Sequence, residues 1–251
     1  MLSLFPNKKA TPHQHNTTRC HDVDELAEAL GAFRALTHLD VSYNHLSQAG
    51  VQHLAARLHH CTALRALDLG MCVRANYTHS LADGLGRCTG LTRLSLNYNN
   101  ITCAPLANYA RALHLCRLLV LVDLTGNAVH CVGARCLATS LEHYAALAEL
   151  VLPFNYIASA GARALLAESA KCPTLVRLDL SNNLVGRQDA LSVDRRAGVL
   201  IRKGFERLLA AARLCTGLRT LNLAYNHLTD TEKHELLDAW GADRGGLAVQ
   251  N

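Results

Sequence analysis

Leucines recur along the chain in short segments that alternate apolar and polar residues. The segment "LTRLSLNYNN" (Leu91–Asn100) has leucines at its first, fourth and sixth positions and an asparagine at its ninth. Such alternation predicts a short strand with one apolar face. The segment "GVQHLAARLHHC" (Gly50–Cys61) follows another copy and spaces its apolar residues three or four apart, which predicts an amphipathic helix.

The strand pattern LxxLxLxxNxL occurs seven times. Five copies keep the asparagine and the apolar positions, and they begin at Leu36, Leu91, Leu147, Leu175 and Leu218. Two weaker copies begin at Leu64, where Cys72 replaces the asparagine, and at Leu119, where Val122 replaces a leucine. Successive copies are 27 or 28 residues apart, except for the last interval of 43 residues. The chain is therefore built from repeats of one strand and one helix.

The consensus and its period resemble the ribonuclease-inhibitor-like leucine-rich repeat family, over about residues 23 to 240. The resemblance implies an α/β solenoid in the form of a curved arc. Short parallel strands would line its concave face and helices its convex face, in about seven repeats plus caps. The residues support the same fold independently, because a single strand and helix cannot bury their apolar faces and must stack on the next copy. The pattern is specific for fold and says little about function.

The pattern divides the chain into three parts. Residues 1–35 are expected to form an N-terminal arm and a capping helix at about 22–33, residues 36–240 the repeat domain, and residues 241–251 a flexible tail. The long interval predicts an inserted loop at about 186–203, which is either a tolerated surface loop or an element that contacts a partner through Arg195 and Arg196.

Two further sets of residues occupy fixed places in the repeats. The asparagines are expected to form an internal ladder that bonds backbone groups, and they are Asn44, Asn99, Asn127, Asn155, Asn183 and Asn226. The turn that enters each helix is expected fourteen residues before the next leucine copy, at Gly50, Tyr77, Pro105, Gly133, Gly161 and Gly204, which are mostly residues suited to such a turn.

Ten cysteines raise the question of metal or disulfide chemistry. Five of them stand three residues before the first leucine of a copy, namely Cys61, Cys88, Cys116, Cys172 and Cys215. Phe33 and Tyr144 fill the same column, so it is interpreted as a packing position whose thiols stay free in a reducing compartment. No CxxC or HxxxH spacing, phosphate-binding loop or nucleophile elbow occurs. We therefore expect no metal, cofactor, catalytic residue or small-molecule substrate.

Charge and hydropathy limit the classes of partner that the chain is expected to bind. The net charge is +5 with a pI near 8.7, but the basic residues are scattered, so a nucleic-acid partner is not favoured. No run of about 18 apolar residues occurs, which argues against a membrane partner. A cytoplasmic or cytoskeletal location is expected. A mitochondrial one is less favoured and rests on the absence of acidic residues from the first 21 positions.

The outward positions of the strands predict where a protein partner binds. Most of their aspartates match the usual repeat consensus, whereas Leu121, Val151 and Phe154 place apolar groups on a face that should be wet. Apolar residues surrounded by charge are typical of an interface core. With the loop arginines, the predicted partner-binding residues are Arg93, Tyr98, Leu121, Glu149, Val151, Phe154, Arg177, Arg195 and Arg196.

The favoured function is a non-catalytic protein-interaction scaffold or structural subunit of a larger assembly. Similar repeat-only proteins suggest the axoneme of a cilium or flagellum as a setting. One alternative is a regulator that resembles the Ran GTPase-activating protein, although that protein has more repeats and an acidic tail. The other alternative is a subunit of an organellar ribonucleoprotein, based on the basic balance of the chain.

Overall fold

The computed structural model describes residues 2–3, 30, 34–44, 46–73, 78–187, 198–241 and 245–250. Leu30 is helical and fully buried, but the rest of the predicted capping helix at 22–33 lies outside the described residues. Arg195, Arg196 and most of the predicted inserted loop also lie outside them.

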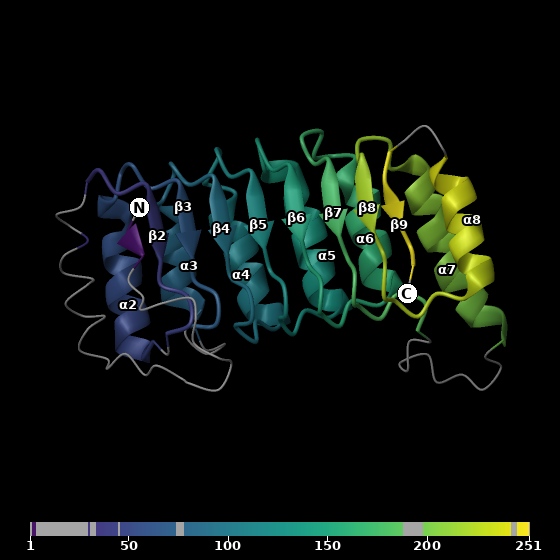
Figure 1. Ribbon diagram of the computed structural model, residues 1–251, viewed down its shortest axis with the longest axis horizontal. Coiled ribbons are helices and arrows are strands. Elements are labelled where there is room, and N and C mark those ends of the chain that lie inside the picture. The colour runs from purple at the N-terminus through teal and green to yellow at the C-terminus, as the bar shows by residue number, and fades with distance from the viewer. Residues whose placement is uncertain are drawn as a thin grey trace.

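The strands form one open parallel sheet whose order, β1 to β9, follows the chain. The bounds are β1 Leu2–Ser3, β2 His38–Asp40, β3 Ala66–Asp68, β4 Arg93–Ser95, β5 Leu121–Asp123, β6 Glu149–Val151, β7 Arg177–Asp179, β8 Thr220–Asn222 and β9 Leu247–Ala248. In Figure 1 the strands stand side by side in one layer, with the helices behind them. This arrangement confirms the predicted leucine-rich repeat solenoid.

Each helix from α2 to α8 packs against the next one along the chain. Their bounds are α2 Gln48–Arg57, α3 Thr78–Gly86, α4 Cys103–Leu113, α5 Cys131–Ser140, α6 Ser159–Ser169, α7 Gly198–Leu214 and α8 Asp230–Trp240. Single turns of 3-10 helix, Leu58–His60 and Leu141–His143, follow α2 and α5. Helices need about 8–10 Å between their axes and paired strands only about 4.8 Å, so the helical layer is the wider one.

The central residue of each strand points into the core. Leu67, Leu94, Val122, Leu150 and Leu178 are paired in register across β3 to β7, and all five are buried. The same register continues to Leu39 in β2 and Leu221 in β8. Val122 occupies the leucine position as a smaller apolar residue, which explains why this weaker copy keeps its place in the sheet.

The predicted asparagine ladder is present, and it joins neighbouring repeats. The Asn127 Oδ1 accepts hydrogen bonds from the backbone amides of Ile101 (2.9 Å) and Asn99 (3.1 Å) in the preceding repeat. Its Nδ2 donates to the Leu96 carbonyl of that repeat and to the Leu124 carbonyl of its own, both at 3.0 Å. Asn99, Asn155, Asn183 and Asn226 repeat this scheme. Asn127, Asn155, Asn183 and Asn226 thus satisfy buried backbone groups of two repeats at once, and Asn99 satisfies those of the preceding repeat.

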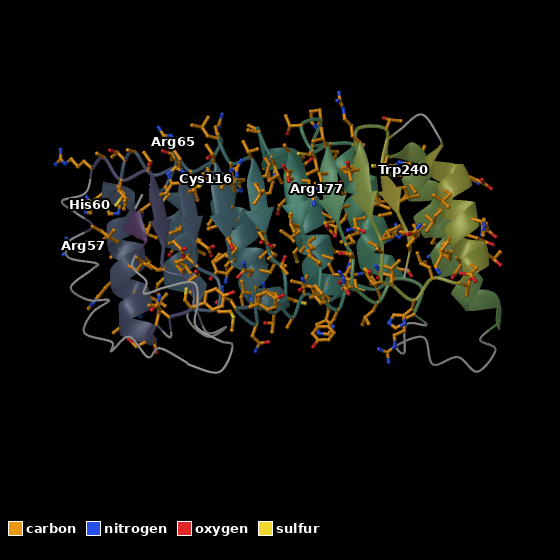
Figure 2. All side chains as sticks on the ribbon, in the orientation of Figure 1. Arg57, His60, Arg65, Cys116, Arg177 and Trp240 are labelled. Atoms are coloured by element: carbon orange, nitrogen blue, oxygen red, sulfur yellow. The ribbon has the colours of Figure 1, made fainter. Side chains whose placement is uncertain are left out.

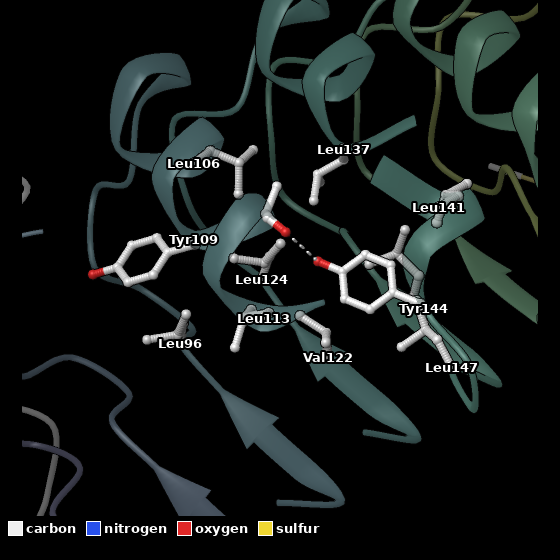
Figure 3. Close-up of a pocket in the computed structure, with 12 residues that line it drawn as sticks. Leu96, Leu106, Tyr109, Leu113, Val122, Leu124, Leu137, Leu141, Tyr144 and Leu147 are labelled. Atoms are coloured by element: carbon white, nitrogen blue, oxygen red, sulfur yellow. Dashed lines mark hydrogen bonds between the residues drawn. The ribbon is translucent and has the colours of Figure 1, made fainter. Parts of the chain in front are cut away.

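Cys72 interrupts the ladder and is accompanied by a second departure from the pattern. Its thiol donates to the Leu69 carbonyl at 2.9 Å, whereas the Leu46 amide bonds to the Cys72 backbone carbonyl instead of a side chain. Tyr109 of α4 stands where the neighbouring helices have leucine, and its hydroxyl is buried without a partner. In Figure 3 that hydroxyl points away from Tyr144, whose own hydroxyl donates to the Ala110 carbonyl.

The residues expected at the entry to each helix lie in the first helical turn of four helices. Gly50, Gly133 and Gly161 are each the third residue of a helix, and Pro105 has the same place in α4. Gly204 departs from the expectation, because it is the seventh residue of α7, and Tyr77 lies outside the described residues. A Cβ at Gly161 would lie 3.0 Å from the Cβ of Ala134 and 3.1 Å from the Cα of Cys131, so the glycine also allows neighbouring helices to approach closely.

Both ends of the chain depart from the prediction. Leu2–Ser3 pairs with β2, so the arm contributes a short strand to the sheet. The tail was expected to be flexible, yet Leu247–Ala248 pairs with β8, Val249 is buried, and Gly245 adopts a left-handed φ of 98°. The backbone bonds that an edge strand leaves open provide the physical reason, because pairing satisfies them without any leucine consensus.

Part of the predicted insertion belongs to a helix. α7 begins at Gly198, so residues 198–203 extend it to 17 residues, whereas α2 to α6 have 9 to 11 residues. The prediction of a loop through residue 203 is wrong at this end. At the C-terminal cap, Leu236 and Trp240 of α8 are buried as expected, and Thr229 and Glu232 form a capping box at its start.

The ladder predicts the effect of two substitutions. Asn127→Ala leaves buried amides and carbonyls of two repeats unpaired, so the free energy of unfolding in urea should fall by about 3 kcal/mol or more. Tyr109→Phe removes a hydroxyl that has no partner, and it should leave that free energy unchanged or raise it by about 1 kcal/mol. A loss below about 1 kcal/mol for Asn127→Ala would contradict the structural role of the ladder.

Candidate functional site

The outward side chains of the strands form one exposed face, called here the sheet face. Its first row contains His38, Ala66, Arg93, Leu121, Glu149, Arg177 and Thr220, which the strand register places side by side. Of the residues predicted to bind a partner, four are therefore direct neighbours in this row: Arg93, Leu121, Glu149 and Arg177. Figure 2 labels Arg177 over the strands of this face.

Charged groups of the sheet face meet around Arg177. Its guanidinium lies 3.5 Å from a carboxylate oxygen of Glu149 and 3.7 Å from one of Asp179. Leu121 and Val151 are half-buried between these charges, on β5 and β6. The predicted combination of apolar residues and surrounding charge is therefore brought together, although Leu121 and Val151 are less exposed than Phe154.

The second outward row contains aspartates that shape the end of each strand. The Oδ1 atoms of Asp40 and Asp123 accept hydrogen bonds from the backbone amides of Ser42 (3.0 Å) and Thr125 (2.8 Å), and Asp68 does the same for Gly70 (2.9 Å). This role agrees with the prediction that most of these aspartates reflect the fold. Burial, followed by the charges of Asp40 and Asp123, raises the pKa of Asp68 above its usual range.

The residue before each ladder asparagine has a left-handed backbone in every repeat. The φ angles are 60° at Tyr43, 50° at Met71, 53° at Tyr98, 66° at Gly126, 54° at Phe154, 53° at Asn182 and 55° at Tyr225. This conformation is easy for glycine and tolerable for asparagine, but it costs other residues about 1–2 kcal/mol. Five of the seven positions nevertheless carry a large side chain.

Those five large side chains are also exposed. Their exposed fractions are 69% for Tyr43, 40% for Met71, 48% for Tyr98, 55% for Phe154 and 62% for Tyr225. Strain that no burial offsets is characteristic of functional positions. We call the four aromatic residues among them, Tyr43, Tyr98, Phe154 and Tyr225, the aromatic ridge.

Sequence reasoning found half of this ridge. Tyr98 and Phe154 were predicted partner residues, whereas Tyr43 and Tyr225, which also stand directly before a ladder asparagine, were not. Their position before the asparagine was a usable signal. The left-handed backbone that makes these residues unusual is not visible in the residue pattern.

The cysteine column is buried, as its interpretation as a packing position requires. Within the described part of the chain, Cys61, Cys88, Cys116, Cys172 and Cys215 form no disulfide. The Cys116 thiol donates to the Leu85 carbonyl at 3.2 Å, and Cys61 does the same to Leu30 at 3.4 Å. Burial raises the pKa of Cys88 to about 12 and that of Cys116 to about 11. Cys88 and Cys116 therefore carry protonated thiols inside the core.

The residues that the structure describes contain neither a metal-binding cluster nor a helix that could span a membrane. No group of three His, Cys, Asp or Glu side chains there is placed to hold a metal ion. In the same part of the chain, no helix is long and apolar enough to cross a membrane.

A family model of known proteins matches two of the repeats. A family model described as leucine-rich repeat matches residues 34–55 and 215–231, which contain the first and last copies of the strand pattern. The crystal structure of the mouse RP105/MD-1 complex is similar over 85% of this chain, with 17% sequence identity and a TM-score of 0.49. This chain spans 30% of the length of that chain.

The strain at the ridge can be measured. Phe154→Gly relieves a left-handed phenylalanine and removes an exposed side chain, so the free energy of unfolding should stay unchanged or rise by up to about 1 kcal/mol. Urea denaturation of the variant and the parent provides the comparison. A loss of more than about 2 kcal/mol would show that Phe154 supports the fold.

Thiol labelling tests the cysteine column. At pH 7.5 iodoacetamide should modify the partly exposed Cys103, Cys131 and Cys136 of the folded protein well before Cys88 and Cys116, because only thiolates react and burial keeps the latter two protonated. Peptide mapping by mass spectrometry identifies each site, and labelling in urea is the control. Equal rates in the folded protein would contradict the buried column.

Proposed function

We propose that this chain is a non-catalytic protein-interaction scaffold that binds a protein partner through its sheet face. The observation that carries the proposal is the aromatic ridge, where exposed aromatic side chains occupy strained backbone. Neither stability nor burial accounts for large side chains at these positions, whereas aromatic residues are enriched among the anchors of protein interfaces.

The centre of the proposed interface extends from the first row, across Val151 of the second row, to Phe154 of the ridge. Phe154 follows β6, and Val151 of the same strand lies in register between Asp123 and Asp179. Leu121, Glu149 and Arg177 are adjacent in the first row. An apolar centre with a charged rim is the usual composition of such an interface. Arg93 and Tyr98 extend it toward β4.

Two finer assignments belong to the same proposal. The period of 27 to 28 residues, with an α-helix of 9 to 11 residues in each repeat from α2 to α6, favours the ribonuclease-inhibitor-like subtype. A cilium or flagellum axoneme is the setting that similar repeat-only proteins suggest. Arg195 and Arg196 remain proposed partner contacts, outside the described residues.

The proposal predicts the effect of a charge on the ridge. Tagged protein carrying Phe154→Asp should capture at least about tenfold less partner from its native cells than the parent protein does. The reason is that binding would remove the new carboxylate from water at the interface. Leu214→Asp is the matched control, since Leu214 is an exposed leucine (76%) at the end of α7, outside the sheet face. Quantitative mass spectrometry measures the partner, and circular dichroism confirms the fold of both variants.

Two results would contradict this interface. Unchanged capture by a folded Phe154→Asp variant would exclude Phe154 and shift attention to residues 186–203. Equal loss in both variants would show that the effect does not depend on the sheet face.

A further inference from the structure

The aromatic ridge has a regular spacing. Large aromatic residues occur in every second repeat, at Tyr43, Tyr98, Phe154 and Tyr225, with Met71, Gly126 and Asn182 between them. The backbone amide of each of these seven residues donates to a carbonyl of the next repeat or of the tail, at 2.8 to 3.2 Å. Parallel-sheet spacing of about 4.8 Å therefore continues through the column, so successive aromatic residues are about 9.6 Å apart.

This distance matches one polypeptide conformation. A polyproline II helix has three residues per turn and rises about 3.1 Å per residue, so its pitch is about 9.3 Å. An α-helix presents the same face at about 5.4 or 10.5 Å, which fits the ridge less well. Aromatic side chains that separate shallow troughs are also the usual surface on which proline-rich segments dock.

The position of one ring is fixed by its neighbour. A Cβ at Gly126 would lie 2.3 Å from the Cδ1 and Cε1 atoms of Tyr98, so the Tyr98 ring leans over Gly126 and needs glycine there. The ring is placed before any partner arrives, which lowers the entropy lost on binding. A polyproline II segment has no internal hydrogen bonds, and its free carbonyls can accept from the hydroxyls of Tyr43, Tyr98 and Tyr225.

The charge beside the ridge selects among such segments. We call Asp40, Asp68 and Asp123 the acidic row. It stands in the second outward row, three residues before the ridge column, and these aspartates are partly exposed. Among the described residues, none of the three forms an ion pair, whereas Asp179 lies 3.7 Å from Arg177. A basic ligand is complementary to these carboxylates.

We infer that the aromatic ridge and the acidic row bind a basic, proline-rich segment in the polyproline II conformation, laid across the strands. About nine residues would reach from Tyr43 to Tyr225, because six repeat intervals span about 29 Å. One face of the segment would place a proline between successive aromatic rings, and another would direct basic residues to the acidic row. The inference rests on the proposed function and names the class of partner.

Peptide binding tests the inference directly. The probe is fluorescein-labelled (Pro-Pro-Arg)4, measured by fluorescence anisotropy with the full chain. It should bind at least about tenfold more tightly than a peptide of eight prolines followed by four arginines, which keeps the composition but loses the three-residue period. (Gly-Gly-Arg)4, with the same charge and no polyproline stiffness, should also bind at least about tenfold more weakly. Equal affinity for all three would overturn the inference, because only charge would then be recognised.

Variants connect the binding to the ridge. Phe154→Gly and Tyr98→Gly suit the left-handed backbone and should each weaken (Pro-Pro-Arg)4 by about tenfold or more, whereas Leu214→Asp should not. Unchanged affinity for (Pro-Pro-Arg)4 in both ridge variants would overturn the inference. If the peptide fails to bind but Phe154→Asp still abolishes capture of the native partner, the polyproline assignment fails and the proposed function stands. If the ridge variants keep both partner capture and peptide binding, the polyproline inference and the proposed function are both contradicted.

Discussion

The structure depends on buried asparagine amides that join neighbouring repeats. Asn127 accepts from amides of the preceding repeat and donates to carbonyls of both repeats, so the backbone groups of this turn are buried without being left unpaired. A repeat cannot move relative to its neighbour without breaking these bonds. Strand register, helix packing and the even spacing of the side chains that follow the strands all depend on this link.

The same link explains how equivalent positions of successive repeats, those directly before the ladder asparagines, form one surface. Because each repeat places its residue before the asparagine in one conformation, the chain can vary that side chain without changing the backbone. Tyr43, Phe154 and Tyr225 lie on the same kind of turn as Gly126 and Asn182. In the function proposed above, binding specificity would depend on which residues occupy the column, and the ladder beneath them supports the backbone strain that they introduce.

Much of the fold was predictable because burial imposes periodicity. Leucines at fixed offsets predicted the strands and helices, and the column of cysteines was correctly interpreted as packing. The C-terminal strand was not predictable, since Leu247–Ala248 pairs through its backbone and needs no leucine consensus. The start of α7 was also hidden, because an insertion can lengthen a helix as readily as a loop. For the site, the repeat period was enough to predict that equivalent residues of successive repeats are neighbours. The left-handed backbone at Tyr43 and Tyr225 is visible only in the structure.

The short strand at the C-terminus has a consequence for the behaviour of the whole molecule. β9 occupies the side of β8 that would otherwise present free amides and carbonyls, and the Gly246 and Ala248 carbonyls accept from the Leu221 and Leu223 amides. A parallel stack of repeats has no inherent end, and an open last strand is a template on which another chain can grow. This pairing makes β9, a strand of two residues, the edge of the described sheet, and so short an edge offers few free amides and carbonyls to another chain.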